Sequence, residues 1–204
     1  MQVSLGGATV ATVIVVSGDD FDIPRVIPPW PAEVGRLFEL SLHRPLTIDD
    51  VMKVAWPKQD RTQLIDGMLV VTPLLEDGAN SRGAARMEIA VALTKETPKD
   101  RGVLLGGNII AGENLLVVDG MVYQKGAATV RDGLAFPAEA VDLAVLVTLP
   151  STRRRTHTLL AQVYQDAGIP LIVVDVINGK TIVKNYGVVP DWADTRAIAA
   201  IGFS

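Results

Sequence analysis

The sequence predicts an α/β (α+β) fold in which helices flank a mixed β-sheet, and three observations support this. Hydrophobic residues make up 49% of the 204 residues and charged residues 21%, which provides enough apolar material for a core. Over 141–177, an apolar segment, a segment of helical pattern and a second apolar segment follow one another, as in a βαβ crossover. Asp66-Gly67 and Asn178-Gly179 each separate two strand-like segments and favour hairpin turns.

The N-terminal part, residues 1–45, is predicted to be an added extension made of a strand and a linker. Residues 8–16 are β-branched and apolar, which is typical of a strand. Residues 24–31 contain four prolines and predict an extended linker. Residues 32–42 favour a short helix, although Gly35 weakens that tendency.

The main domain is expected to span 46–186, and its first half alternates helices and strands. Thr47 is expected to cap a helix through about Trp56, with Asp50 in the place of the usual capping-box glutamate. The remaining elements of this half are predicted by their patterns: a hairpin over 61–73, an amphipathic helix over 81–96, strands near 103–105, 108–111 and 114–123 separated by Gly106-Gly107 and Gly112, and a loop over 126–140.

The second half of the domain begins with a strand over 141–149, which is almost wholly apolar and therefore expected to be covered on both faces. Ser151 or Thr152 is expected to cap the helix that follows, and Gly168 with Pro170 to end it. Strands are predicted over 171–177 and 180–184. Residues 187–204 form a tail in which a short amphipathic segment follows Pro190.

Composition excludes several classes of protein. The net charge of −4 argues against a protein that coats nucleic acid without specificity. The absence of cysteine excludes disulfides and thiolate metal sites. Met1–Val16 is apolar but lacks a basic start and is interrupted by Gly6-Gly7, so neither a signal peptide nor a membrane span is expected. The expected location is the cytoplasm or a soluble assembly, including a virion.

Three stretches in order along residues 46–186 resemble one large bacterial family. They are Gln63–Val71, read as Gln-Leu-Ile-Asp-Gly-Met-Leu-Val-Val; Asn114–Asp119; and residues 142–170, with Asp142, Pro150-Ser151-Thr152-Arg153-Arg154-Arg155, Tyr164, Ala167-Gly168 and Pro170. The sequence resembles the Uma-two group of restriction-endonuclease-like proteins, of the PD-(D/E)xK type. The resemblance implies a mixed sheet flanked by helices and, in active members, Mg²⁺-dependent cleavage of DNA.

The resemblance also implies where the chemistry of the family would lie. Its carboxylates fall at Gln63, Asp119 and Leu146, its lysine falls at Leu160, and an acidic residue of its helix falls at Thr156. Only Asp119 keeps the charge. Since Mg²⁺ binds through clustered carboxylates and retained waters, one carboxylate is a poor site. The chain therefore resembles a degenerate member, with no catalytic residue, no metal and no cofactor expected.

Other arrangements of polar residues stay open. Asp142 and Glu113 are candidates to join Asp119 in a rearranged Mg²⁺ site, with Lys125 near it; the alternative is that they are solvated or cap turns. His157 has the chemistry of a general base, but the sequence offers no evident partner and favours an exposed helical histidine. Phosphate contact is the functional interpretation of Arg153, Arg154 and Arg155, and a solvated helix start is the alternative.

Two functions from different classes follow. The first is a catalytically inactive nuclease-like domain that acts by binding or as a structural subunit of a larger assembly. Its expected partners are copies of the chain or other protein subunits, contacted through the N-terminal extension, since an apolar strand can add to the edge of a neighbour's sheet. The same strand can instead pack on its own domain. The second function is a Mg²⁺-dependent endonuclease with a rearranged site.

Overall fold

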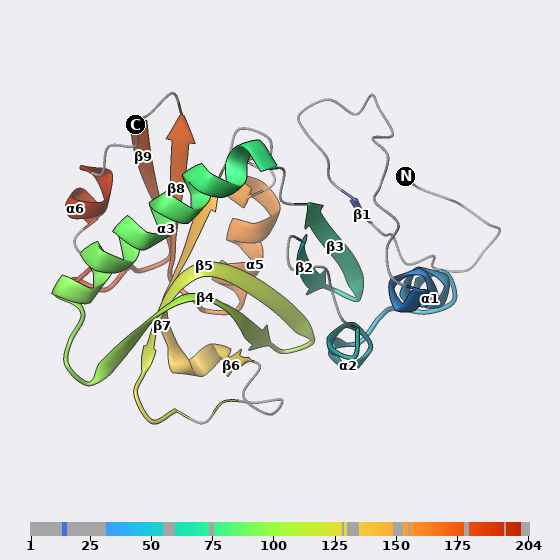
Figure 1. Ribbon diagram of the computed structural model, residues 1–204. Coiled ribbons are helices and arrows are strands. Elements are labelled where there is room, and N and C mark those ends of the chain that lie inside the picture. The colour runs from blue at the N-terminus through green and yellow to red at the C-terminus, as the bar shows by residue number, and fades with distance from the viewer. Residues whose placement is uncertain are drawn as a thin grey trace. The chain divides into compact units, whose positions relative to one another are not determined.

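The computed structural model describes residues 14–15, 32–54, 60–73, 76–127, 129, 135–148, 153–154, 156–177, 180–193 and 195–200. The chain divides into two compact units (Figure 1): Met1–Leu75 with Gly112–Leu116 form the first, and Glu76–Ala111 with Val117–Ser204 form the second. Each is described by itself below. The boundaries at 45 and 186 remain predictions based on sequence.

A hairpin organises the first unit. Strand β2 (Asp60–Ile65) pairs antiparallel with β3 (Met68–Pro73) around the turn Asp66-Gly67. The φ angles of Asp66 and Gly67 are 49° and 74°, as a type I′ turn requires, so the predicted hairpin is confirmed. A Cβ on Gly67 would lie 2.6 Å from the Cβ of Pro45, a clash that only glycine avoids at this approach.

Further pairing extends the sheet of the first unit. Leu64 of β2 pairs with Leu115, at the start of β5 (Asn114–Gln124). The other strand of the hairpin, β3, pairs in parallel with β1 (Ile14–Val15). The described part of the predicted N-terminal strand therefore pairs within its own chain, which is the second of the two alternatives for it. The rest of that strand and the proline-rich linker lie outside the described residues.

The two helices of the first unit are α1 (Ala32–Ser41) and α2 (Ile48–Met52). The predicted capping box is confirmed: the Asp50 N–H donates to the Thr47 side chain, and the Thr47 N–H donates to the Asp50 carboxylate. The prediction of a helix to about residue 56 is wrong, because α2 ends at Met52. In a continued helix the ring of Pro57 would clash with the carbonyl of Lys53, where the cap lies.

The second unit contains a mixed sheet. Its strands are β4 (Arg101–Ala111), the rest of β5, β6 (Phe136–Pro137), β7 (Val141–Thr148), β8 (Leu171–Ile177) and β9 (Lys180–Tyr186). Strand β7 is antiparallel to β5 and parallel to β8, while β8 and β9 are antiparallel. The parallel β7–β8 pair confirms the predicted crossover.

Helices pack against this sheet. Helix α3 (Glu76–Glu96) and α6 (Thr195–Ala199) share an apolar core with one face of the strands: Ala85, Ile89, Leu93, Val122, Leu143, Val145, Val147, Ile172, Val174, Ala193 and Ile198. Leu146 and Val173 alternate with these strand residues and so point to the other face. The crossover between β7 and β8 carries a π-helical turn, η2 (Thr156–Leu160), and α5 (Ala161–Asp166), which contacts β8.

Glycine ends the crossover helix as predicted. Gly168 has a φ of 70°, and its N–H donates to the carbonyl of Gln165. The Ile169 N–H donates to the carbonyl of Tyr164, which completes a Schellman motif. The residues predicted to cap the start of this helix, Ser151 and Thr152, lie outside the described residues, as does the turn at Asn178-Gly179.

Other predicted boundaries were wrong. Gly106-Gly107 does not break the strand, since β4 runs through it; Gly107 has a φ of 139°, and a Cβ there would lie 2.4 Å from Met121 Cε. Glycine here permits a close approach between strands rather than ending one. The predicted loop 126–140 contains β6, paired with β4, and a 3₁₀ turn η1 (Ala138–Ala140).

The remaining differences are extensions. Helix α3 begins at Glu76 instead of 81, and β9 continues to Tyr186.

Among the residues that the structure describes, no helix combines the length and apolar character needed to cross a bilayer. The predicted class, mixed helices and strands with a mixed sheet flanked by helices, is confirmed.

Candidate functional site

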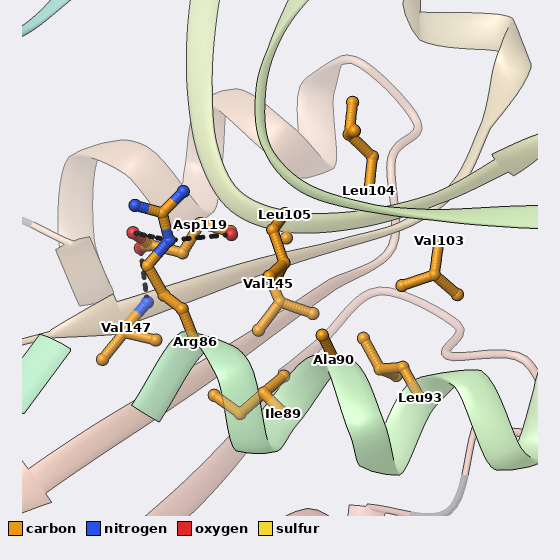
Figure 2. A pocket seen from close by; sticks show the side chains of 11 residues that line it. Arg86, Ile89, Ala90, Leu93, Val103, Leu104, Leu105, Asp119, Val145 and Val147 are labelled. Atoms are coloured by element: carbon orange, nitrogen blue, oxygen red, sulfur yellow. Dashed lines mark hydrogen bonds and ion pairs between the residues drawn. The ribbon is translucent and has the colours of Figure 1, made fainter. Parts of the chain in front are cut away.

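Asp119 lies on β5 in the second unit and is only 3% exposed. Its Oδ2 accepts a hydrogen bond of 2.7 Å from the backbone N–H of Val147 on β7. Arg86 of α3 points toward it (Figure 2): Nε donates to the Asp119 carbonyl at 3.2 Å and lies 3.7 Å from Oδ1. Asp119 thus has a cation and an amide donor from within its own unit.

Hydrocarbon surrounds this pair. The space beside Asp119 has no room for a water-sized sphere, and it is bordered by side chains of α3, β4 and β7, among them Ile89, Ala90, Leu93, Val103, Leu104, Leu105, Val145 and Val147 (Figure 2). In such surroundings an unpaired charge is costly, so the guanidinium of Arg86 stabilises the ionised form of Asp119.

The other positions that the sequence resemblance singled out hold uncharged side chains. Leu146 on β7 and Leu160 on η2 are both buried, and so is Thr156. Gln63 is buried on β2 in the first unit. The sequence-based interpretation that the two leucines belong to the apolar packing of their strand and helix agrees with their burial.

The residues considered for a rearranged metal site are engaged elsewhere or exposed. Asp142 forms an ion pair with Arg101. The Nζ of Lys125 donates to the carbonyl of Lys99 at 2.8 Å. Glu113 is exposed in the turn before β5. Within the described ranges, no three His, Asp or Glu side chains gather closely enough to hold a metal ion.

A second buried carboxylate, Asp175 on β8, was missed by the sequence analysis. It is fully buried and lies opposite Thr148 in the β7–β8 register. Its Oδ1 accepts hydrogen bonds from Thr148 Oγ1 at 2.6 Å and from His157 Nε2 at 2.7 Å, and its Oδ2 accepts one from Arg153 Nε at 2.9 Å. The signal was present, since a carboxylate inside the apolar run Leu171–Ile177 has to be paired.

His157 connects Asp175 to a tyrosine. Its Nδ1 lies 2.6 Å from the hydroxyl of Tyr186 on β9, and the two rings are tilted with centroids 5.9 Å apart. The prediction that His157 is an exposed helical histidine without a partner was wrong. In the neutral imidazole, a proton on Nε2 donates to the Asp175 carboxylate, which leaves Nδ1 to accept the Tyr186 O–H.

The surroundings shift the pKa values of two members of this cluster. Burial pushes the pKa of Asp175 upward, but hydrogen bonds from Thr148, His157 and Arg153 outweigh it, so the pKa of Asp175 is lowered. The pKa of Tyr186 is raised, mainly by burial and also by the charge of Asp175. Tyr186 therefore keeps its proton at neutral pH unless a base removes it.

The arginine triplet is not one equivalent group. Arg153 is held by Asp175 while its side chain remains 41% exposed, and Arg154 is exposed. Arg155 lies outside the described residues. The structure thus brings Arg153 and His157 together around Asp175, in a cluster that does not include Asp119.

Comparisons with known proteins give one informative likeness. No family model matches the chain, and no curated protein matches it either. A solved structure described as a "putative nuclease" of DUF820, from Anabaena variabilis ATCC 29413, is similar with a TM-score of 0.55 and 15% identity. The match covers 74% of this chain and 93% of that one. At this identity the likeness shows the fold alone: the chain has a restriction-endonuclease-like fold.

Proposed function

We propose that this chain uses the restriction-endonuclease-like fold for binding or as a subunit of an assembly, without metal-dependent cleavage of DNA. The observation that carries the proposal is the pairing of Asp119 with Arg86 and the Val147 N–H. A nuclease of this kind needs its carboxylates turned toward a hydrated divalent cation. Here the negative charge of Asp119 is already balanced by a guanidinium.

Two buried leucines support the same conclusion. Metal-dependent hydrolysis requires further oxygen ligands, and a nearby cation to stabilise the charge that develops on the phosphate. Leu146 and Leu160, at the family positions for the glutamate and the lysine, supply neither. Charging either position would place an ion among apolar side chains at a cost of several kcal/mol.

DNA cleavage tests this part of the proposal. Duplex and single-stranded DNA are incubated with the chain and Mg²⁺ or Mn²⁺, beside the Asp119→Ala variant. We expect no cleavage above the level of that variant. Cleavage that depends on the metal and disappears in Asp119→Ala would instead establish the Mg²⁺-dependent endonuclease with a rearranged site.

The proposed partners are copies of this chain or other protein subunits, contacted through the N-terminal extension. Leu42, within that extension, is a large apolar side chain that is 48% exposed, so its substitution can disrupt a contact made there. Native mass measurement tests the assembly, first with the chain alone and then with the products of neighbouring genes. A discrete oligomer or mixed complex that is lost in Leu42→Asp is expected. A monomer under every condition would contradict the proposal.

A further inference from the structure

Three side chains of the second unit are connected by hydrogen bonds, at a site separate from Asp119. Asp175 of β8 binds His157 Nε2 at 2.7 Å, and His157 Nδ1 binds the Tyr186 hydroxyl at 2.6 Å. A hydroxyl within reach of a base, with the base oriented by a third group, is the arrangement that activates a nucleophile. The three residues come from β8, η2 and β9, so the fold, not the local sequence, assembles them.

We propose that Tyr186 is a base-assisted nucleophile that attacks a phosphoryl ester without a metal ion. A bond forms between Tyr186 Oη and phosphorus, and the bond from phosphorus to the leaving oxygen breaks. The Tyr186 proton passes to His157 Nδ1. The leaving oxygen lies in line with the attacking oxygen on the far side of phosphorus, so it departs with its bonding electrons and takes a proton from solvent, to which His157 later returns its own. Asp175 acts as a positioning residue, because it holds the imidazole and stabilises the imidazolium that forms.

The surroundings provide a cation for the substrate. Asp175 binds Arg153 through Nε, which fixes the guanidinium while the side chain stays 41% exposed. A guanidinium has further N–H donors besides Nε, and these suit phosphate oxygens, whose charge grows during the attack. In this proposal Arg153 stabilises the negative charge of the phosphoryl group, a role that neither Tyr186 nor His157 fills.

The place of the cluster in the fold is consistent with a reactive site. Thr148 is the last residue of β7, and Asp175 lies beside it in the parallel pair. Tyr186 pairs with Leu171 at the start of β8, so His157 connects the two ends of this strand. His157 lies in a π-helical turn, a rare geometry that occurs frequently at functional sites.

The first test measures the reactivity of the tyrosine in the wild-type chain, with EDTA present. An aryl sulfonyl fluoride is added, and the labelling rate of each tyrosine is followed by peptide mass spectrometry. Tyr123, which is half-buried and packs on Phe136, serves as the internal comparison. Since a positioned base contributes roughly 100-fold or more, Tyr186 is expected to react about 100-fold faster than Tyr123. Equal rates would overturn the proposal.

Matched variants separate the roles. His157→Gln is expected to bring Tyr186 down to the rate of Tyr123, and Asp175→Asn to slow it by about tenfold or more. Thermal melting confirms that each variant is folded. If Asp175→Asn does not fold, His157→Gln still tests the role of the base. His157 is less buried than Asp175, so its substitution is better tolerated by the fold. Unchanged labelling of Tyr186 in folded His157→Gln would refute the role of the base.

The second test addresses the phosphoryl class. Bis(4-nitrophenyl) phosphate, again with EDTA, is expected to release one 4-nitrophenolate per chain and to leave the phosphoryl group on Tyr186. Arg153→Gln should reduce this reaction by about tenfold or more, and by a larger factor than it reduces the sulfonyl fluoride rate, because only the phosphodiester is an anion. No reaction with the phosphodiester would overturn the assignment of the substrate class. Because EDTA is present, neither test depends on the outcome of the Mg²⁺ cleavage assay.

Discussion

Two buried aspartates in the same unit are used in opposite ways. Asp119 is enclosed by apolar side chains and neutralised by Arg86 and a backbone amide. Asp175 is equally buried, yet it connects outward through His157 to Tyr186 and through Arg153 to a half-exposed guanidinium. The interactions of Asp119 end at Arg86 and the Val147 amide among apolar side chains. Asp175 instead positions His157 and Arg153, which lie nearer the surface.

The contrast teaches that a residue type at a family position says little without its partners. Asp119 is the aspartate that the sequence resemblance singles out, and within the described ranges no group of three His, Asp or Glu side chains could hold a metal ion. Asp175 was not among the candidate residues predicted from the sequence. In the structure it is connected by hydrogen bonds to four side chains: Thr148, Arg153, His157 and, through His157, Tyr186. The two regions therefore respond differently to substitution.

The largest expected effect is that of Asp175→Asn. The amide cannot balance Arg153 and cannot accept all three hydrogen bonds, so the free energy of unfolding should fall by about 3 kcal/mol, the lower end for a broken buried ion pair because Arg153 is half-exposed. Asp142→Asn is the matched control, since its ion pair with Arg101 is only partly buried, and it should cost about 1 kcal/mol or less. Urea unfolding measures both, and equal losses would contradict the special role of Asp175.

A smaller effect is expected at the other aspartate. Arg86→Met leaves Asp119 with the Val147 amide but without a cation, and should cost about 2 kcal/mol. The double variant Arg86→Met, Asp119→Asn should recover part of that loss, because the charge is then gone as well. A double-mutant cycle from urea unfolding measures the coupling. Strict additivity would show that Arg86 does not stabilise the charge.

The pH dependence isolates Asp175 further. Its pKa is lower in the folded chain than in the unfolded chain, so its contribution to stability is complete above the unfolded value of about 4 and is lost as the pH falls through the folded value. Between pH 5 and pH 2 the wild type should thus lose more stability than Asp175→Asn. Parallel curves for the two proteins would show that the folded and unfolded pKa values of Asp175 are alike.

Much of the fold was predictable from sequence, for local reasons. The turn at Asp66-Gly67, the cap at Thr47 and the helix end at Gly168 each depend on a few neighbouring residues whose conformational preferences are strong. The strand that carries Leu146 and the crossover after it followed from hydrophobic pattern alone.

The cluster around Asp175 was not predictable in the same way. His157, Asp175 and Tyr186 lie on three separate elements, and only the register of β8 and β9 and the π-helical turn bring them together. Because a π-helical turn has no clear sequence pattern, the direction in which the His157 side chain points could not be predicted from the sequence. The sequence did contain one hint, a carboxylate in the middle of an apolar strand, and it called for a search for a buried partner.

The smallest effects concern the crossover that carries His157. Gly168→Ala places a Cβ at a φ of 70° and should cost about 1 kcal/mol through backbone strain, since no other atom lies within 4 Å. Gly83→Ala in α3 is the matched control: there too the Cβ would meet nothing, the φ is not positive, and stability should rise by about 1 kcal/mol or less. Thermal melting distinguishes the two signs.

In our interpretation the charge of Asp119 is balanced by Arg86 and not by a divalent cation. The decisive measurement is a calorimetric titration of Mn²⁺ into the chain after removal of metals with EDTA. We expect no saturable heat, in the wild type and in Asp119→Asn alike. Saturable binding of Mn²⁺ in the wild type that is lost in Asp119→Asn would show that Asp119 is a metal ligand.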